Sequence, residues 1–205
     1  MKPKFFKNRY ILARAKIAFA ILLKGRVSFR KILNAAHCWF AQKFHFVKAA
    51  PFPFMINFEL WNECNAQCTF CRTDDGVIYD QNPENKGQVP IPKGKMSLEL
   101  YKEIIEQSKD HILIAVLYVN GEPLMYKGLY EAIQFASDRG VATLISTNGE
   151  LLTENNIKKL LESGLDFVKI AISGFSQDIY TVQHRGCHIE KIKDNLETLA
   201  RLRDL

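Results

Sequence analysis

Four short apolar runs alternate with helical patterns from residue 54 onward, and this alternation limits the fold more than any other feature. Residues 112–119, with the sequence ILIAVLYV, form a nearly continuous apolar run of the kind found in strands buried on both faces. The other runs are 54–60, 141–146 and 167–172. Strands that are each followed by a helix form right-handed βα units around a parallel sheet. The sequence therefore predicts an α/β fold.

Capping residues and glycines mark the helices between these runs. Ser97 and Thr153 stand where N-caps are expected, and Gly140 and Gly164 follow the last residues of two helical patterns. We expect helices at 97–105, 129–139, 153–161 and 176–183, and a final one carrying Ile189, Ile192, Leu196 and Leu199. Glycine and proline are frequent in residues 73–95, which predicts an irregular insertion there.

The first 50 residues differ from the rest of the chain in charge. They contain twelve Lys or Arg and no Asp or Glu, whereas residues 51–205 are net acidic. The pattern predicts two helices with a break near Lys24-Gly25, the second across 28–47, and Pro51 and Pro53 end this zone. We therefore divide the chain into a basic helical arm, residues 1–50, and a core domain, residues 51–205.

The apolar run 17–23 in this arm is too short to cross a bilayer, which takes about 20 residues. Basic residues flank the run, and no cleavage pattern of a secretory signal follows it. We expect a cytoplasmic protein, with the arm available for peripheral attachment to the inner face of the membrane.

Three cysteines, Cys64, Cys68 and Cys71, lie within eight residues directly after the first predicted strand. Their CxxxCxxC spacing does not suit a disulfide framework and indicates a metal or cluster site in a reducing compartment. Three thiolates suit three irons of a [4Fe–4S] cube and leave the fourth iron open. The alternative is a structural zinc site, which needs four ligands, and no second paired motif is present. We interpret Cys38 and Cys187 as ordinary buried or half-buried thiols.

With this motif after its first strand, the chain resembles the radical S-adenosylmethionine (SAM) superfamily over most of residues 54–205. The resemblance implies a partial (β/α)6 TIM-like barrel, of which about four βα units are present, so we expect a truncated core domain. It also implies that the amino and carboxylate groups of SAM bind the open iron. An electron, supplied by a reduced flavodoxin or ferredoxin-type donor, then splits the sulfonium. The product is a 5′-deoxyadenosyl radical, which abstracts hydrogen from a substrate that the sequence does not identify.

The loop Asn120-Gly121-Glu122-Pro123 follows the second predicted strand and resembles the GGEP motif of that superfamily, with Asn in place of the first Gly. The resemblance implies that Gly121, Glu122 and Pro123 receive the methionine amino group of the cofactor. Gly121 lets the backbone approach a ligand, and Glu122 supplies an anion opposite an ammonium. A plain turn is the alternative interpretation.

Further cofactor contacts are expected at the ends of the third and fourth strands. Ser146-Thr147-Asn148-Gly149 resembles a polar strand-end motif that lies near the ribose, which implies binding roles for Ser146 and Asn148. Ser173 is expected to hydrogen-bond the ribose, although the fourth strand departs from the Ser and Asp pattern of many relatives. Phe70 stands where the family has an aromatic residue that packs against adenine.

A YxxxRG-like stretch, formed by Tyr180 and His184-Arg185-Gly186, resembles relatives of the SPASM type. We expect Arg185 to brace its loop against the sheet rather than to hold the cofactor carboxylate. His37 and His45 in the arm lack the spacing of metal ligands and are interpreted as surface or packing residues.

A second interpretation of the whole protein is a non-catalytic binding module that docks through its basic arm on a membrane or an acidic partner. Aromatic residues are interleaved with the arm's cations, which suits an anionic membrane surface. The same residues suit a helical lid whose apolar face covers the barrel. Binding to the phosphates of a nucleic acid is the least favoured of the three.

Overall fold

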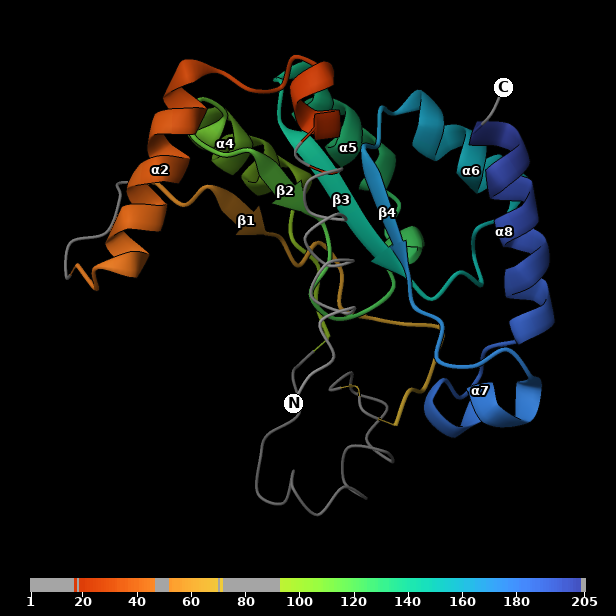
Figure 1. Ribbon diagram of the computed structural model, residues 1–205. Helices are drawn as coiled ribbons and strands as arrows, with labels where there is room; N and C mark the ends of the chain where they lie inside the picture. Colours follow the sequence, from red (N-terminus) through yellow and green to blue (C-terminus); the bar gives the residue numbers. More distant parts are fainter. Residues whose placement is uncertain (1–16, 18, 47–51, 70, 72–92, 204–205) are drawn as a thin grey trace.

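A four-stranded sheet forms the centre of the computed structural model, which describes residues 17, 19–46, 52–69, 71 and 93–203. The strands follow one another in space as in sequence: β1 (Met55–Asn57), β2 (Ile114–Val116), β3 (Ala142–Thr147) and β4 (Phe167–Ile170). Each neighbouring pair is parallel (Figure 1). The predicted α/β fold, consistent with part of a TIM-like barrel, is confirmed.

Helices connect and follow these strands at the places that the sequence predicts. They are α4 (Leu98–Ser108), α5 (Leu129–Asp138), α6 (Glu154–Glu162), α7 (Gln177–Gln183) and α8 (Ile189–Arg203), with a short 3-10 helix, η2, at Pro123–Met125. Ser97 and Thr153 are the observed N-caps of α4 and α6, and the side chain of each accepts a backbone N–H three residues on. The local capping chemistry therefore located both helices correctly.

Strands β1, β2 and β4 are shorter than predicted, because the apolar pattern continues past the paired residues, whereas β3 has the predicted length and is shifted by one residue. Ladder hydrogen bonds reach one residue beyond the assigned ends, where Phe58 N–H donates to the Val116 carbonyl and Leu117 N–H to that of Leu144. The chain then leaves the sheet, and Val119, inside the predicted strand, is half exposed. Loops at the carboxyl edge thus begin earlier than hydrophobicity indicates.

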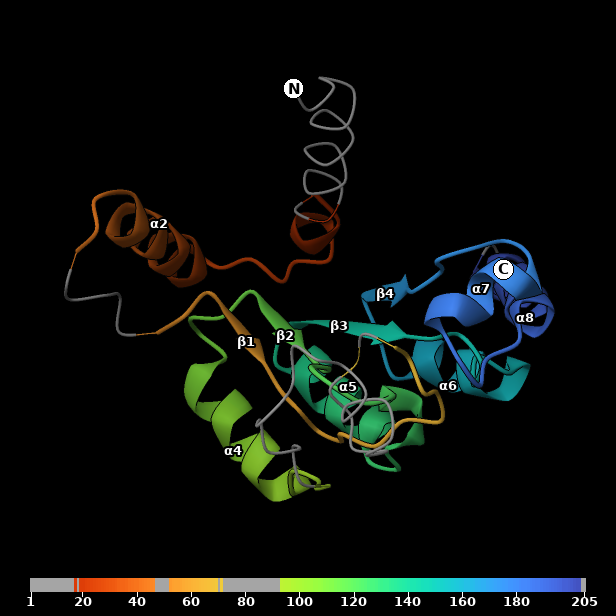
Figure 2. The ribbon, with the colours of Figure 1, turned by 90° about the horizontal axis from the view of Figure 1, so that it is seen from below.

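The two faces of the sheet differ in what covers them. Helices α4, α5 and α6 pack on one face, as Figure 2 shows, and bury the main core there. That core includes Phe58, Leu60, Tyr101, Ile133, Ile145 and Ile157. The opposite face carries Met55, Asn57 and Lys169, which are exposed, and half-buried Ser146 is the register partner of Lys169. Among the described residues, this second face is the open one.

The described part of the arm contains α2 (Phe29–Lys43), which Ser28 caps, after a turn at Lys24 and Gly25. The predicted second arm helix reached residue 47 but ends at Lys43, because His45 adopts a left-handed backbone (φ 53°) and reverses the chain. Helix α2 lies near β1, on the side of the sheet away from α4–α6 (Figure 2). No helix in the described ranges has the length and apolarity to span a membrane. Most of the predicted insertion, 73–95, lies outside the described residues.

Candidate functional site

The cysteine loop follows β1 at the carboxyl edge of the sheet, and the connection between α7 and α8 fixes its path. Gln67 N–H donates to the Arg185 carbonyl (2.8 Å) and Thr69 N–H to the Gln183 carbonyl (3.0 Å). Ala66, 2% exposed, is buried in a small cluster that includes Tyr180. The loop is therefore held by a segment more than 100 residues away in sequence. The Arg185 contact with this loop is made by its backbone.

The motif thiols are free and partly exposed, and neighbouring groups hydrogen-bond two of them. Cys64 Sγ accepts from the Ala66 amide (3.4 Å) and from Asn148 Nδ2 (3.8 Å). Cys68 Sγ lies 3.3 Å from Nδ1 of His184, whose own pKa is lowered by burial. The Ala66 amide and Asn148 Nδ2 thus donate to the sulfur of Cys64, and hydrogen bonds of this kind tune iron–sulfur clusters in proteins.

Burial and neighbouring thiols favour the protonated form of two of the motif cysteines. Burial first, and then the neighbouring Cys71 and Cys64, raise the pKa of Cys68 to about 12, and burial likewise raises the pKa of Cys64. Three thiolates in one place need a compensating positive charge, which iron supplies. In the described ranges, no three His, Cys, Asp or Glu side chains are grouped so as to hold a single metal ion. By its chemistry, a set of three thiolates suits a [4Fe–4S] cube, which binds each thiolate on a different iron, whereas a structural zinc takes four ligands.

The Asn120-Gly121-Glu122-Pro123 loop is fastened to the segment that leads into the cysteines. The backbone N–H and the side-chain amide of Asn120 both donate to Glu59 Oε1 (3.1 and 2.7 Å), and Glu122 N–H donates to the Glu63 carbonyl (2.9 Å). Gly121 has φ 73°, and a Cβ there would lie 2.7–2.8 Å from backbone atoms of residues 61 and 62. Glycine is thus required where these two backbone segments cross.

Glu122 joins the ends of two strands through its carboxylate. The side chain is buried, with the residue 1% exposed. Oε1 accepts from Thr147 Oγ1 (2.8 Å) and Leu124 N–H (3.2 Å), and Oε2 accepts from Asn148 N–H (2.9 Å). Burial raises the pKa of Glu122, and these three hydrogen bonds partly offset that rise. A carboxylate has about four acceptor positions, and the three hydrogen bonds use two on Oε1 and one on Oε2.

The other predicted cofactor residues lie in different surroundings. Asn148 is buried beside the cysteine loop, and its Nδ2 also donates to Asn65 Oδ1 (2.9 Å). Ser146 lies on the open face of the sheet, Pro123 is buried at the start of η2, and Ser173 is exposed beyond β4. Phe70 lies outside the described residues. The structure therefore brings Glu122 and Asn148 to the cysteine loop and leaves Ser173 in solvent.

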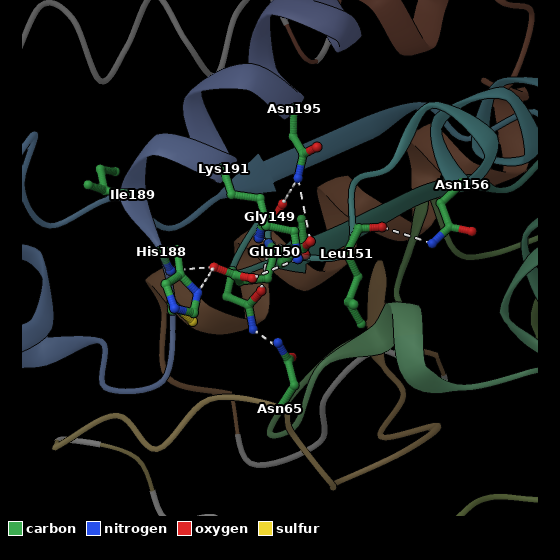
Figure 3. Close-up of polar contacts among 12 residues, drawn as sticks. Asn65, Gly149, Glu150, Leu151, Asn156, His188, Ile189, Lys191 and Asn195 are labelled. Carbon is green, nitrogen blue, oxygen red and sulfur yellow. Dashed lines mark hydrogen bonds and ion pairs between the residues drawn. The ribbon is translucent and has the colours of Figure 1, made fainter. Parts of the chain in front are cut away.

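A second buried carboxylate, Glu150, was missed by the sequence reasoning. It accepts from the backbone N–H of His188 and from Lys191 Nζ (3.0 Å), at the start of α8 (Figure 3). Burial opposes its ionisation, but these contacts together lower the pKa of Glu150. Asn195 Nδ2 donates to the Gly149 carbonyl (2.8 Å) in the same group. The only sequence signal was an acid directly after a strand-end Asn-Gly turn.

A parallel α/β sheet with three free thiols on the loop after its first strand, and a buried acid beside them, defines a cluster-binding half barrel. Residues 58–204 match the family described as the Radical SAM superfamily. The chain belongs to this superfamily. Its cofactors are a [4Fe–4S] cluster and SAM.

Curated relatives with several different activities are similar to this chain. It is 29% identical over 131 residues to the S-adenosylmethionine-dependent nucleotide dehydratase of Flammeovirga pacifica, covering 64% of this chain and 42% of that protein. It is 30% identical over 121 residues to the Fe-coproporphyrin III synthase of Methanosarcina barkeri, covering 58% and 27%. The chain thus spans less than half the length of these relatives.

Solved structures share the fold at lower identity. SuiB of Streptococcus suis, bound to its precursor peptide SuiA, has a TM-score of 0.59 at 14% identity, covering 81% of this chain and 34% of that one. Native anSMEcpe with bound AdoMet has a TM-score of 0.56 at 17% identity, covering 74% and 42%. At these identities the likeness shows the fold alone.

Proposed function

We propose that Cys64, Cys68 and Cys71 hold the cluster and that the site cleaves SAM reductively to start hydrogen abstraction from a substrate. A reduced cluster held by these cysteines would supply one electron for cleavage of SAM to methionine and a 5′-deoxyadenosyl radical, which would abstract hydrogen from a substrate C–H bond to give 5′-deoxyadenosine. A reduced flavodoxin or ferredoxin-type protein is the proposed electron donor.

The observation that carries this proposal is the convergence of three strand-end loops. Glu122 N–H donates to Glu63 in the segment entering the cysteine loop, while its carboxylate accepts from the end of β3. Asn148 in turn reaches Cys64 Sγ at 3.8 Å. Ligands of parallel α/β proteins bind at the carboxyl ends of the strands, where these groups lie.

Individual residues have separate tasks in this proposal. Asn148 and His184 orient the sulfurs of Cys64 and Cys68 through hydrogen bonds. Glu122 offers its remaining Oε2 acceptor position to the ammonium of the methionine part. Ser146 lies on the open face of the sheet, and in this proposal it hydrogen-bonds the ribose.

Anaerobic reconstitution with iron and sulfide tests the proposal. The wild-type chain should bind about four irons, show broad visible absorption, and release 5′-deoxyadenosine from SAM under strong reductant without added substrate. Cys68→Ala should lose both the absorption and the product. Cys38→Ala is the matched control, because Cys38 lies in the arm helix α2 and donates to the Phe52 carbonyl.

Two outcomes would contradict the proposal. A colourless wild-type protein with one zinc per chain would replace the cluster with a structural metal. A cluster-loaded protein that releases product no faster than Cys64→Ala would favour the non-catalytic binding module.

A further inference from the structure

Helix α2 meets the core with two polar side chains and small residues, while its large apolar side chains are exposed, which is unusual for a surface helix. Its buried residues are Lys31, Asn34 and Ala41. Lys31 Nζ donates to the Gly140 carbonyl (2.6 Å), and Asn34 Nδ2 donates to the carbonyls of Pro53 and His111 (3.2 Å each). These acceptors immediately precede β1, β2 and β3, so α2 docks at the amino edge of the sheet.

Arg26 fixes the segment before α2 at the same edge. Its Nε lies 3.0 Å from Asp166 Oδ1, and its other nitrogens donate to Ser137 Oγ (2.8 Å) and to nearby carbonyls. Both charged side chains are nearly buried, at 9% and 1% exposure. The orientation of α2 is therefore set by polar contacts that leave its other face outward.

Large apolar side chains occupy that outward face. We name as the α2 outer face the residues Phe29, Ile32, Leu33, Trp39 and Phe40. Each is between 48% and 73% exposed. Phe44 and Phe46 extend the aromatic surface past the helix end, with ring centroids 6.0 Å apart. Isolated exposed apolar residues are ordinary, but a contiguous stripe marks a surface that binds something.

Charge identifies the kind of partner. Arg30 and Lys43 flank the α2 outer face, and both are exposed; Lys43 Nζ lies 4.6 Å from the Trp39 ring centroid, and Arg30 Nη1 lies 3.9 Å from the exposed Asp110 carboxylate. Residues 1–50 contain twelve cations and no acid, and of these cations Arg26 and Lys31 are buried against the core. Aromatic and aliphatic residues bordered by cations match the interface of an anionic bilayer, where apolar groups enter the headgroup boundary and cations meet phosphates.

We propose that the α2 outer face lies on an anionic lipid surface and attaches the protein peripherally. A second copy fits less well, because two-fold pairing sets a basic surface against itself. Nucleic acid phosphates would engage the cations but leave the aliphatic residues in water. Since α2 docks at the amino edge and the cysteine loop lies at the carboxyl edge, attachment leaves the site clear of the lipid (Figure 1).

Vesicle flotation tests the proposal with the full 205-residue chain. Vesicles of phosphatidylglycerol and phosphatidylcholine should carry the wild-type protein, and vesicles of phosphatidylcholine alone should carry far less. Trp39→Ala/Phe40→Ala should lower the partition coefficient by about 100-fold, because two aromatic side chains no longer leave water. Arg30→Gln/Lys43→Gln should lower it by roughly fivefold for each charge removed.

Phe175→Ala is the matched control, because Phe175 is the most exposed aromatic residue outside the arm in the described part of the chain. It should bind like the wild type. In a Trp61→Phe background, the fluorescence of Trp39 should shift to shorter wavelength on anionic vesicles, which reports that this side chain enters the interface.

Three results would overturn the proposal. One is equal flotation of the wild type and Trp39→Ala/Phe40→Ala. Another is a wild-type dimer in sedimentation that this double variant converts to monomer, which would make the face an interface between copies. The third is binding to duplex DNA that the same double variant abolishes, which would assign the face to nucleic acid.

Discussion

Removing the carboxylate of Glu122 should destabilise the fold far more than an ordinary loop substitution. Glu122→Ala leaves the donors of Thr147, Asn148 and Leu124 without an acceptor, in a place where the Glu122 residue is only 1% exposed. Each buried donor left unsatisfied costs about 1–3 kcal/mol. The variant no longer buries a carboxylate, which offsets part of that loss. We expect a decrease of about 3–5 kcal/mol in the free energy of unfolding, a large share of the ~5–15 kcal/mol typical of a domain.

Urea unfolding of the reduced, cluster-free chain, followed by far-UV circular dichroism, measures this decrease. Glu162→Ala serves as the control, because Glu162 is an exposed acid at the end of α6, and should change stability by less than ~0.5 kcal/mol. A loss below ~1 kcal/mol in Glu122→Ala would refute the reasoning, since it would mean that the three donors are already hydrated or paired elsewhere.

The Glu122→Gln variant separates the contribution of Glu122 to stability from its proposed contribution to SAM binding. Its carbonyl can still accept from Thr147 and Leu124, while its amide faces the N–H of Asn148, so the loss should be about 1–3 kcal/mol. SAM affinity is therefore best compared between the wild type and Glu122→Gln at full iron content. The loss of an anion opposite the ammonium should weaken binding by roughly ten- to a hundred-fold.

Two further substitutions test the contacts at opposite edges of the sheet. Asp166→Ala leaves Arg26 buried without its anion. In urea titrations it should lower the free energy of unfolding by about 3–5 kcal/mol, and an unchanged unfolding midpoint would contradict a stabilising buried ion pair. Glu150 has a pKa below its usual 4.5, so its ionised form adds stability above that pH, and this stability is lost as the pH falls through the folded-state pKa. Glu150→Gln should be less stable than the wild type at pH 7. In thermal unfolding, the difference in stability between the two proteins should decrease below pH 4.5, and a difference that is independent of pH would exclude this role.

The sequence predicted the order of the elements because their signals are local. N-caps at Ser97 and Thr153 and the apolar runs depend on neighbours within a few residues, and the structure keeps them. The position of the cysteine loop at the carboxyl edge follows from its place after β1. The predicted lengths of β1, β2 and β4 were wrong, since pairing depends on the neighbouring strand rather than on the hydrophobicity of residues such as Tyr118 and Val119.

Long-range polar contacts could not be predicted from the same patterns. Asn120 was recognised as a departure from the family motif, but its pairing with Glu59 depends on how two strand ends meet. The side of α2 that meets the core is another contact of this kind. In the described residues Lys31 and Asn34 donate to backbone carbonyls at the amino edge, and the large apolar side chains of α2 are exposed. An amphipathic pattern identifies the apolar and polar faces of a helix, but it does not determine which of the two faces packs against the core.

The close approach of two backbone segments at Gly121 affects how this motif is interpreted in related sequences. The glycine is imposed by the backbone of residues 61 and 62, which leaves no room for a Cβ. A descendant that had lost all three cysteines would still need glycine at this place to keep its loops folded. Glycine at this position of the motif is therefore required by the path of the backbone. Its presence in a related sequence indicates that the fold is kept, and does not by itself indicate catalytic activity.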